Sequence, residues 1–340
     1  MSFLVLLSSC GLTDLGVYIV PTPNEAPTKT SSGPSPETAV SASLGAVSAP
    51  AKSNFEVAGY LPRYQIANVD PSVARYLTDL VYFTFWPTSN GGFSKDALLP
   101  SHLSFLREVK ERYGTRILIG LTDQQTNGPL AHVCDHPSLR LKLADGLASY
   151  LTAMDFDGVA IDWEYPDSEH LHGYTLLLEA IHQAFAPLGL KLTVAISPSH
   201  PLESDAYQWV NRVHVMSYDD WGRHSTLASA AADIQNLIAQ GVEPGKLQLG
   251  VPFYGRGYTD DGPSWNDAVS YKLLQQRFDP PPNKDTVSGY YFNGIETVKE
   301  KVLLAKSEGL SGVMVWEIGQ DTTGSTSLLR AISETRRAFN

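Results

Sequence analysis

Short apolar runs alternate with amphipathic segments from about residue 54 to the end of the chain. The apolar runs are rich in β-branched and aromatic residues, and they predict strands at 55–60, 80–86, 116–121, 158–163, 192–196, 212–217, 247–251 and 312–316. Segments between them repeat apolar residues at a spacing of about 3.6, and they predict helices at 101–113, 137–154, 171–185, 226–240 and 295–308. Apolar strands separated by helices indicate a parallel sheet covered by helices.

The number of these units favours one particular α/β fold. Eight strand–helix units over about 285 residues fit a single (β/α)8 TIM barrel, whose usual length is about 250 residues. A doubly wound open sheet is the alternative, but it often carries a GxGxxG turn, and none follows a predicted strand here. We therefore expect one barrel domain at 54–340, with its functional residues at the C-terminal ends of the strands.

The region before the barrel has a different character. Leu7-Ser8-Ser9-Cys10-Gly11 follows a short apolar run and resembles the cleavage and lipidation box of bacterial lipoprotein signals, although a basic segment before it is missing. We expect residues 1–20 to be a signal or anchor region with Cys10 lipidated. The protein would then be exported to the extracellular space or cell envelope, with membrane attachment through Cys10. Residues 21–53 are rich in Pro, Ser, Thr and Ala and predict a flexible linker.

Composition narrows the classes of partner. The formal net charge of −11 argues against nucleic acid, which normally binds a basic surface. The two cysteines, Cys10 and Cys134, imply no disulfide framework. His132, Cys134 and His136 are metal-ligand residue types without a partner cluster in the sequence. We expect a monomer that uses no metal and no other cofactor.

Two carboxylates at the end of the predicted strand 158–163 are the main candidates for chemistry. Side chains alternate along a strand, so Ala160, Asp162 and Glu164 share one face. Burying two like charges is costly unless they are paired or used, and such a pair is a candidate for acid–base work. The alternative is a solvated strand end.

The other predicted strands end in aromatic and polar residues: Tyr60, Trp86, Tyr218, Asp219, Tyr254, Arg256, Trp316 and Glu317. Tyr and Trp often pack with a polar tip that reaches a partner, so any one of them could be structural. Together they suggest a cleft with carboxylates on its floor and aromatic walls. A sugar fits such a cleft, because its ring faces are apolar and its edges form hydrogen bonds.

With these motifs, residues 54–336 resemble family 18 of the glycoside hydrolases, the chitinase family. The family signature DxxDxDxE reads DGVAIDWE at 157–164 and is followed by Tyr165-Pro166. The segments MSYD at 216–219, GVPFYGR at 250–256 and GVMVWE at 312–317 resemble the family's motifs on strands six, seven and eight. VAGY at 57–60 resembles its first strand.

The resemblance implies retaining, substrate-assisted hydrolysis of β-1,4 bonds in polysaccharides of N-acetylglucosamine (GlcNAc), such as chitin or chito-oligosaccharides. Glu164 would be the general acid and base, Asp162 would orient the substrate's 2-acetamido N–H, and Tyr218 would bind the acetamido oxygen. The residues expected to bind substrate are Tyr60, Phe85, Met216, Asp219, Arg256 and Trp316.

Two departures and two alternatives accompany this interpretation. Ala160 stands where the family usually has a second inward Asp. We therefore expect slower turnover or a shift in the acidic limb of the pH–rate profile. The segment 258–295 is too short for the full α+β insertion of many members, which favours a more open cleft. Hydrolysis of another GlcNAc glycan, from peptidoglycan or an N-glycan core, is one alternative. A catalytically weak chitin-binding lectin is the other, although such lectins typically lose the residue equivalent to Glu164.

Overall fold

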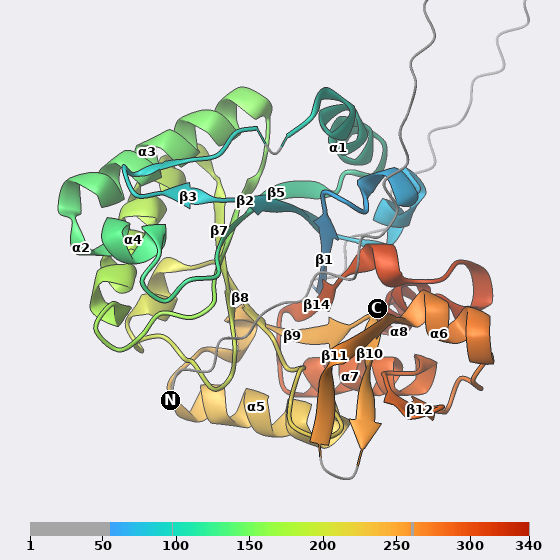
Figure 1. Ribbon diagram of the computed structural model, residues 1–340. Helices are drawn as coiled ribbons and strands as arrows, with labels where there is room; N and C mark the ends of the chain where they lie inside the picture. The colour runs from blue at the N-terminus through green and yellow to red at the C-terminus, as the bar shows by residue number, and fades with distance from the viewer. Residues whose placement is uncertain (1–54, 97, 260–261, 340) are drawn as a thin grey trace, which may run out of the picture. The chain divides into compact units, whose positions relative to one another are not determined.

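Eight parallel strands close into a barrel in the computed structural model, which describes residues 55–96, 98–259 and 262–339 (Figure 1). Around the barrel the order is β1-β14-β9-β8-β7-β6-β5-β2. In chain order these strands are β1 (Glu56–Pro62), β2 (Asp79–Phe85), β5 (Arg116–Asp123), β6 (Gly158–Trp163), β7 (Lys191–Ile196), β8 (Arg212–Val215), β9 (Leu247–Pro252) and β14 (Gly312–Trp316). The predicted (β/α)8 barrel is confirmed, and every barrel strand starts and ends within two residues of its predicted bounds. The predicted signal region 1–20, Cys10 and the linker 21–53 lie outside the described residues.

The helices lie outside the ring of strands in Figure 1. The five predicted ones are α1 (Pro100–Tyr113), α3 (Pro137–Met154), α4 (Leu171–Phe185), α5 (Leu227–Ala239) and α7 (Ile295–Ser307). Three were not predicted: α2 (Pro129–Asp135), α6 (Tyr271–Phe278) and α8 (Leu328–Arg337). These have 7, 8 and 10 residues, so any apolar spacing in them extends over fewer turns than in the longer helices. Within the described part of the chain, no helix has the length and apolar character needed to cross a membrane.

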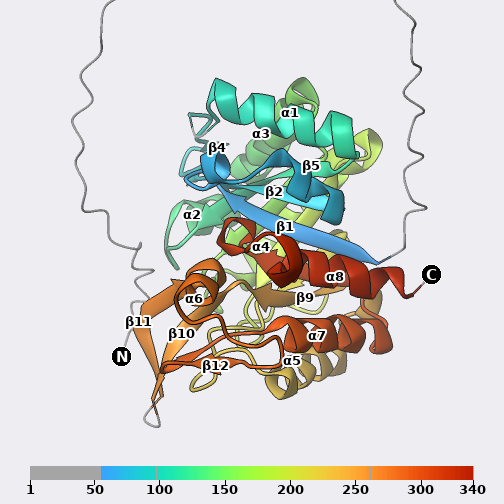
Figure 2. The same ribbon diagram turned by 90° about the vertical axis from the view of Figure 1, so that its right-hand side faces the viewer.

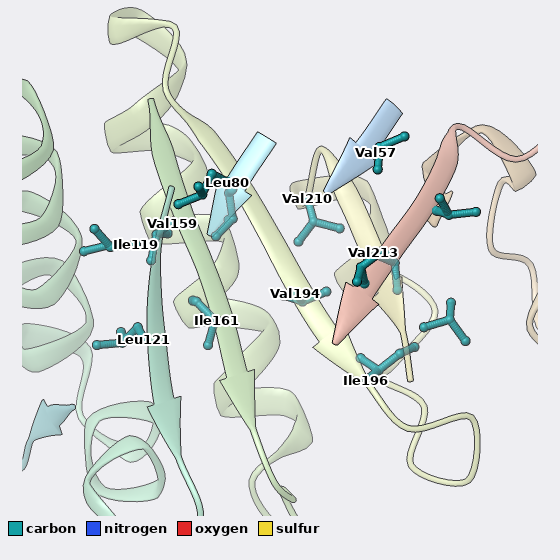
Figure 3. Packing of buried hydrophobic residues seen from close by; sticks show 14 of the residues in the cluster. Val57, Leu80, Ile119, Leu121, Val159, Ile161, Val194, Ile196, Val210 and Val213 are labelled. Carbon is teal, nitrogen blue, oxygen red and sulfur yellow. The ribbon is translucent and has the colours of Figure 1, made fainter. Parts of the chain in front are cut away.

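Alternation along the strands divides the core into two layers. One set of side chains faces the helices, and Figure 3 shows part of this outer layer, including Val159 and Ile161 of β6. The other set fills the barrel interior: Ala58, Tyr60, Val81, Leu118, Ala160 and Met314. Ala160 therefore lies inside the barrel, on the face that the sequence predicted for it.

A small antiparallel sheet interrupts the barrel between β9 and α7. Its order is β11-β10-β13-β12, and α6 connects its second and third strands in the chain. The bounds are β10 (Tyr254–Thr259), β11 (Gly262–Ser270), β12 (Thr286–Val287) and β13 (Tyr290–Tyr291). A two-stranded sheet of β3 (Pro87–Thr88) and β4 (Gly92–Phe93) follows β2. Because these additions follow the C-terminal ends of β9 and β2, they lie at the same end of the barrel (Figure 2).

The opposite end of the barrel is closed by a charge network around Glu56, at the start of β1. The Glu56 carboxylate lies 3.0 Å from Arg116 Nη2 and 2.5 Å from Arg212 Nε, and it accepts a 3.0 Å hydrogen bond from Gln248. Burial alone would raise the pKa of Glu56, but the hydrogen bond and charge of Arg212 lower it below the ordinary value. Because these charged groups are paired with one another, we assign them to the stability of the barrel. The functional residues are expected at the C-terminal ends of the strands.

Candidate active site

Asp162 and Glu164 lie at the C-terminal end of β6. Asp162 is the last inward-facing residue of the strand and is 3% exposed, and Glu164 follows the strand directly. The backbone N–H of Glu164 donates to the carbonyl of Asp123 at the end of β5 at 2.8 Å, which fixes the chain as it leaves the barrel. Asp157, the first acid of the motif, is structural: its Oδ2 accepts from the Ile117 N–H at 2.7 Å.

The environment of both carboxyl groups favours their protonated forms. Burial raises the pKa of Asp162 well above its ordinary value, and the charge of Glu164 raises it further. Burial also raises the pKa of Glu164, while a side-chain hydrogen bond with Tyr165 opposes the shift. Because the two titrations interact, the pair can hold one proton between them, so that one carboxyl group acts as a general acid while the other is ionised.

Asp162 is only partly satisfied by the protein around it. Among the described residues, its Oδ1 atom is buried and has no hydrogen-bond partner. The inward position one step back on β6 is Ala160, which is fully buried among apolar side chains and supplies only a methyl group. Ala160 can donate no hydrogen bond to Asp162, so this buried acceptor stays unpaired among the described residues.

Tyr218 and Asp219 follow β8, which is separated from β6 by β7 in the barrel. Tyr218 packs against the inner cluster, and its hydroxyl lies 4.0 Å from the sulfur of Met314. This ring needs a glycine opposite it, since a Cβ at Gly250 would lie 2.9 Å from Tyr218 Cε1 and 2.3 Å from the Val215 carbonyl oxygen. The glycine that opens the GVPFYGR segment thus makes room for the tyrosine of MSYD.

Asp219 is held as an anion by the small sheet. Tyr254 Oη donates to Asp219 Oδ1 at 2.7 Å, and Arg256 donates through Nε to Oδ1 at 2.6 Å and through Nη2 to Oδ2 at 2.8 Å. Burial alone would raise the pKa of Asp219, but His224, whose Nδ1 lies 3.6 Å from Asp219 Oδ1, and the hydrogen bonds from Arg256 hold it well below its ordinary value. Arg256, which we expected to bind substrate, is 7% exposed and forms its hydrogen bonds with Asp219.

Aromatic rings line the interior beside the two carboxyl groups. Tyr60 of β1 packs against Trp316 of β14 with ring centroids 5.6 Å apart, and Phe83 lies edge-on to Trp316 at 5.0 Å. Met216 packs against the same cluster. The predicted residues Tyr60, Met216 and Trp316 are thus brought together with Tyr218.

Phe85 was predicted to bind substrate, and this prediction is wrong. Its side chain is fully buried in the outer layer, with ring centroids 6.1 Å from Tyr82 and 5.8 Å from Tyr150. The pairing of β2 with β5 shifts register between Tyr82 and Phe85, which breaks the strict alternation that would have turned Phe85 inward. Phe83 lies on the inner side instead, facing Gly120, and Thr84 donates to Thr122 Oγ1 at 2.7 Å.

His214 of β8 is a site residue that the sequence interpretation missed. Its Nδ1 lies 2.8 Å from the Tyr60 hydroxyl, and its side chain is buried in the barrel. Burial lowers the pKa of His214 to about 3, so the imidazole is neutral at neutral pH and can exchange a hydrogen bond with Tyr60. A polar residue at an inward position of an apolar strand was the signal that could have identified it.

Three large aromatic side chains are exposed near the ends of the barrel strands: Tyr64 at 67%, Trp86 at 44% and Trp221 at 73%. From the sequence, Trp221 could be a sugar platform or could pack within its loop, and this exposure argues against packing. Within the described part of the chain, no group of three or more His, Cys, Asp or Glu side chains is placed to hold a metal ion. Cys134 is buried in the outer layer of the core.

Comparisons with known proteins agree on one family. The sequence profile of "Glycosyl hydrolases family 18" matches residues 56–321. "Endochitinase 1" of Metarhizium robertsii is 25% identical over 284 residues, which cover 67% of this chain and 66% of that protein. "Probable chitinase 2" of Drosophila melanogaster is 25% identical over 247 residues, 54% of this chain and 51% of that protein. The chain thus spans about half to two thirds of the length of these relatives.

Solved structures share the fold. A chitinase from Bacteroides thetaiotaomicron superposes with a TM-score of 0.75 at 19% identity, covering 83% of this chain and 96% of that one. The Group IV chitinase of Ostrinia furnacalis in complex with allosamidin superposes with a TM-score of 0.71 at 20% identity, covering 84% and 99%. At these identities the likeness establishes the fold, while chemistry has to be argued from the side chains.

Proposed function

The chain belongs to family 18 of the glycosyl hydrolases, and we propose that it hydrolyses β-1,4 glycosidic bonds between GlcNAc units of chitin or chito-oligosaccharides. One observation supports this most strongly. Asp162 and Glu164 lie together at the C-terminal end of β6, both with raised pKa values, beside Tyr218 and the rings of Tyr60 and Trp316. A lectin would have no use for a buried acid with a raised pKa at this position.

The proposed reaction is substrate-assisted and retaining, one of the exceptions to the usual scheme of two carboxylates. Glu164 donates its proton to the glycosidic oxygen as the C1–O bond breaks. The carbonyl oxygen of the substrate's own 2-acetamido group attacks C1 and closes an oxazolinium ring. Asp162 accepts the acetamido N–H through its carboxylate and stabilises the positive charge. Glu164 then takes a proton from the water that opens the ring.

The neighbouring residues bind and orient the sugar. Tyr218 donates to the acetamido oxygen as it approaches C1, and Asp219, kept anionic by Arg256, accepts from a sugar hydroxyl. Trp316 lies beneath the same sugar with Tyr60 beside it, because an aromatic ring complements an apolar pyranose face.

Product analysis on defined substrates tests this proposal. The purified protein is incubated with chito-oligosaccharides of three to six units, and products are followed by mass spectrometry and by proton NMR of the new reducing end. We expect shorter chito-oligosaccharides whose first-formed anomer is β. Cleavage only of peptidoglycan fragments or of N-glycan cores would correct the substrate class. Binding of chito-oligosaccharides without cleavage of any GlcNAc glycan would establish the lectin instead.

The alanine at position 160 predicts a measurable change in pH dependence. In Ala160→Asp, the new carboxyl group would lie inside the barrel beside Asp162 and could donate its proton to the unpaired Oδ1 atom. This donor stabilises the anionic form of Asp162, so the acidic limb of kcat/KM should move to lower pH. The thermal midpoint should fall, since a polar group enters an apolar layer. Superimposable pH–rate profiles of the two proteins would contradict the role given to position 160.

A further inference from the structure

Lys301 is a fully buried lysine on α7, outside the site described above. Its side chain has 0% exposure, and it lies between the apolar residues Val298 and Val302 on the buried side of the helix. Lysines are almost never fully buried unless paired, because removing the ammonium from water is costly. Burial lowers the pKa of Lys301 to about 7, against the charges of Asp220, Asp285 and Asp233. An apolar side chain would fill this position without the free-energy cost of burying an amine. The presence of a lysine here therefore requires an explanation.

The amine contacts the loop that follows β8. Lys301 Nζ donates to Ser225 Oγ at 2.6 Å, and Ser225 Oγ in turn donates to the carbonyl of Ser217 at 2.7 Å. The two serines are the ends of segment 217–225, so one chain of hydrogen bonds from α7 ties the start of this loop to its end.

Two further side chains hold the same segment from neighbouring elements. Ser217 Oγ donates to Asp233 Oδ2 on α5 at 2.5 Å. Asn293, which precedes α7, donates through Nδ2 to the carbonyl of Ser225 at 2.8 Å. Inside the loop, the Asp220 N–H donates to the His224 carbonyl at 3.1 Å. The loop is therefore fixed by hydrogen bonds at both ends and across its middle.

The conformation fixed in this way is an unfavourable one. Asp219 has φ 65°, in the left-handed region that few non-glycine residues adopt. Such a residue persists only where its surroundings determine its conformation. The same segment carries Tyr218, and His224 Nδ1 lies 3.6 Å from Asp219 Oδ1. A change in the loop would therefore move two side chains of the site together.

We propose that Lys301 is a positioning residue, which through Ser225 fixes segment 217–225 so that Tyr218 and Asp219 face the cleft. The effect on turnover rests on the proposed function, while the effect on the loop does not. The amine retains a hydrogen to donate whether it is charged or neutral, so the contact with Ser225 persists across the neutral pH range.

Lys301→Met tests the proposal, because methionine fills similar space and lacks the donor. We expect kcat on chito-oligosaccharides to fall roughly 10-fold or more with a smaller change in KM, since a misplacement of about 1 Å can cost about 10²-fold. Hydrogen exchange of amides in 217–225 should become faster, while α7 stays protected as in the wild type. The matched control is Lys299→Met on the same helix, whose partly exposed side chain pairs with Glu296; it should change neither quantity.

Ser225→Ala provides the second variant, because it removes the hydroxyl between Lys301 and Ser217 and leaves the lysine in place. The two substitutions should be non-additive, with the double variant no slower than the slower single one. Wild-type exchange in 217–225 with wild-type kcat, in either folded variant, would overturn the proposal. If the wild type hydrolyses no GlcNAc glycan, the proposed function fails, and the exchange rates of the loop still decide the role of Lys301.

Discussion

Glu164→Gln is expected to lower kcat on chito-oligosaccharides by roughly 10²–10⁴-fold, the contribution typical of a positioned general acid and base. Glutamine has nearly the same shape, but its amide can neither protonate the glycosidic oxygen nor deprotonate the attacking water. KM should change little, because the aromatic and Asp219 contacts are untouched. Initial rates on chitotetraose, fitted for kcat and KM separately, check the prediction.

The stability of the variant separates chemistry from folding. Burial raises the pKa of Glu164 above its unfolded value, so ionising it costs stability as the pH rises through that window. Gln cannot ionise, and Glu164→Gln should therefore melt at the wild-type temperature or above it at pH 8. Glu169→Gln is the control, since Glu169 is exposed on the same loop. Retention of a tenth or more of wild-type kcat by a folded Glu164→Gln would exclude Glu164 as the general acid.

The pH dependence of the site can be traced to few groups. Arg256 and His224 hold the pKa of Asp219 well below its ordinary value, and burial lowers the pKa of His214 to about 3. Both groups therefore keep one charge state through the weakly acidic and neutral range. Changes in rate over that range should therefore come from Asp162 and Glu164. Because the titrations of these two groups interact, each limb of the pH–rate profile describes the pair and not one residue.

The fold and the position of the two carboxyl groups on β6 could be predicted because both depend on local alternation. Eight apolar strands leave few ways to bury both faces of a sheet, and the face shared by Ala160, Asp162 and Glu164 follows from the pleat alone. Phe85 could not be placed because a register shift with β5 breaks that alternation, and nothing in 80–86 marks the shift. The prediction for Phe85 assumed that side chains alternate along the whole of 80–86. The register shift that breaks this alternation can be seen only in the pairing of β2 with β5.

The support of the site could not be predicted because its members are brought together only by the closed barrel. Lys301, Ser225 and Asp233 come from α7, a loop and α5, and each looks like an ordinary polar residue in its own segment. The left-handed backbone of Asp219 is likewise absent from the sequence pattern, which shows only a Tyr-Asp pair after a strand. Long-range contacts of this kind determine how well a predicted site is held.

Asp162→Asn is the second substitution expected to have a large effect, with kcat reduced by roughly 10²-fold or more, because it removes a preorganised charge facing the oxazolinium ion. The asparagine amide keeps the shape of the carboxylate but carries no charge. Its NH2 group is a donor, so it cannot accept a hydrogen bond from the acetamido N–H. A choice of substrate distinguishes this loss from that of Glu164→Gln. An aryl chitobioside has a leaving group that needs little protonation, so it should partly restore the rate of Glu164→Gln.

The same aryl substrate should leave Asp162→Asn as impaired as it is on chitotetraose, because closure of the oxazolinium ring still depends on the acetamido group. Asp155→Asn, on an exposed residue before β6, is the control and should behave as wild type on both substrates. Equal recovery of both variants on the aryl chitobioside would mean that Asp162 acts on proton transfer to the leaving group.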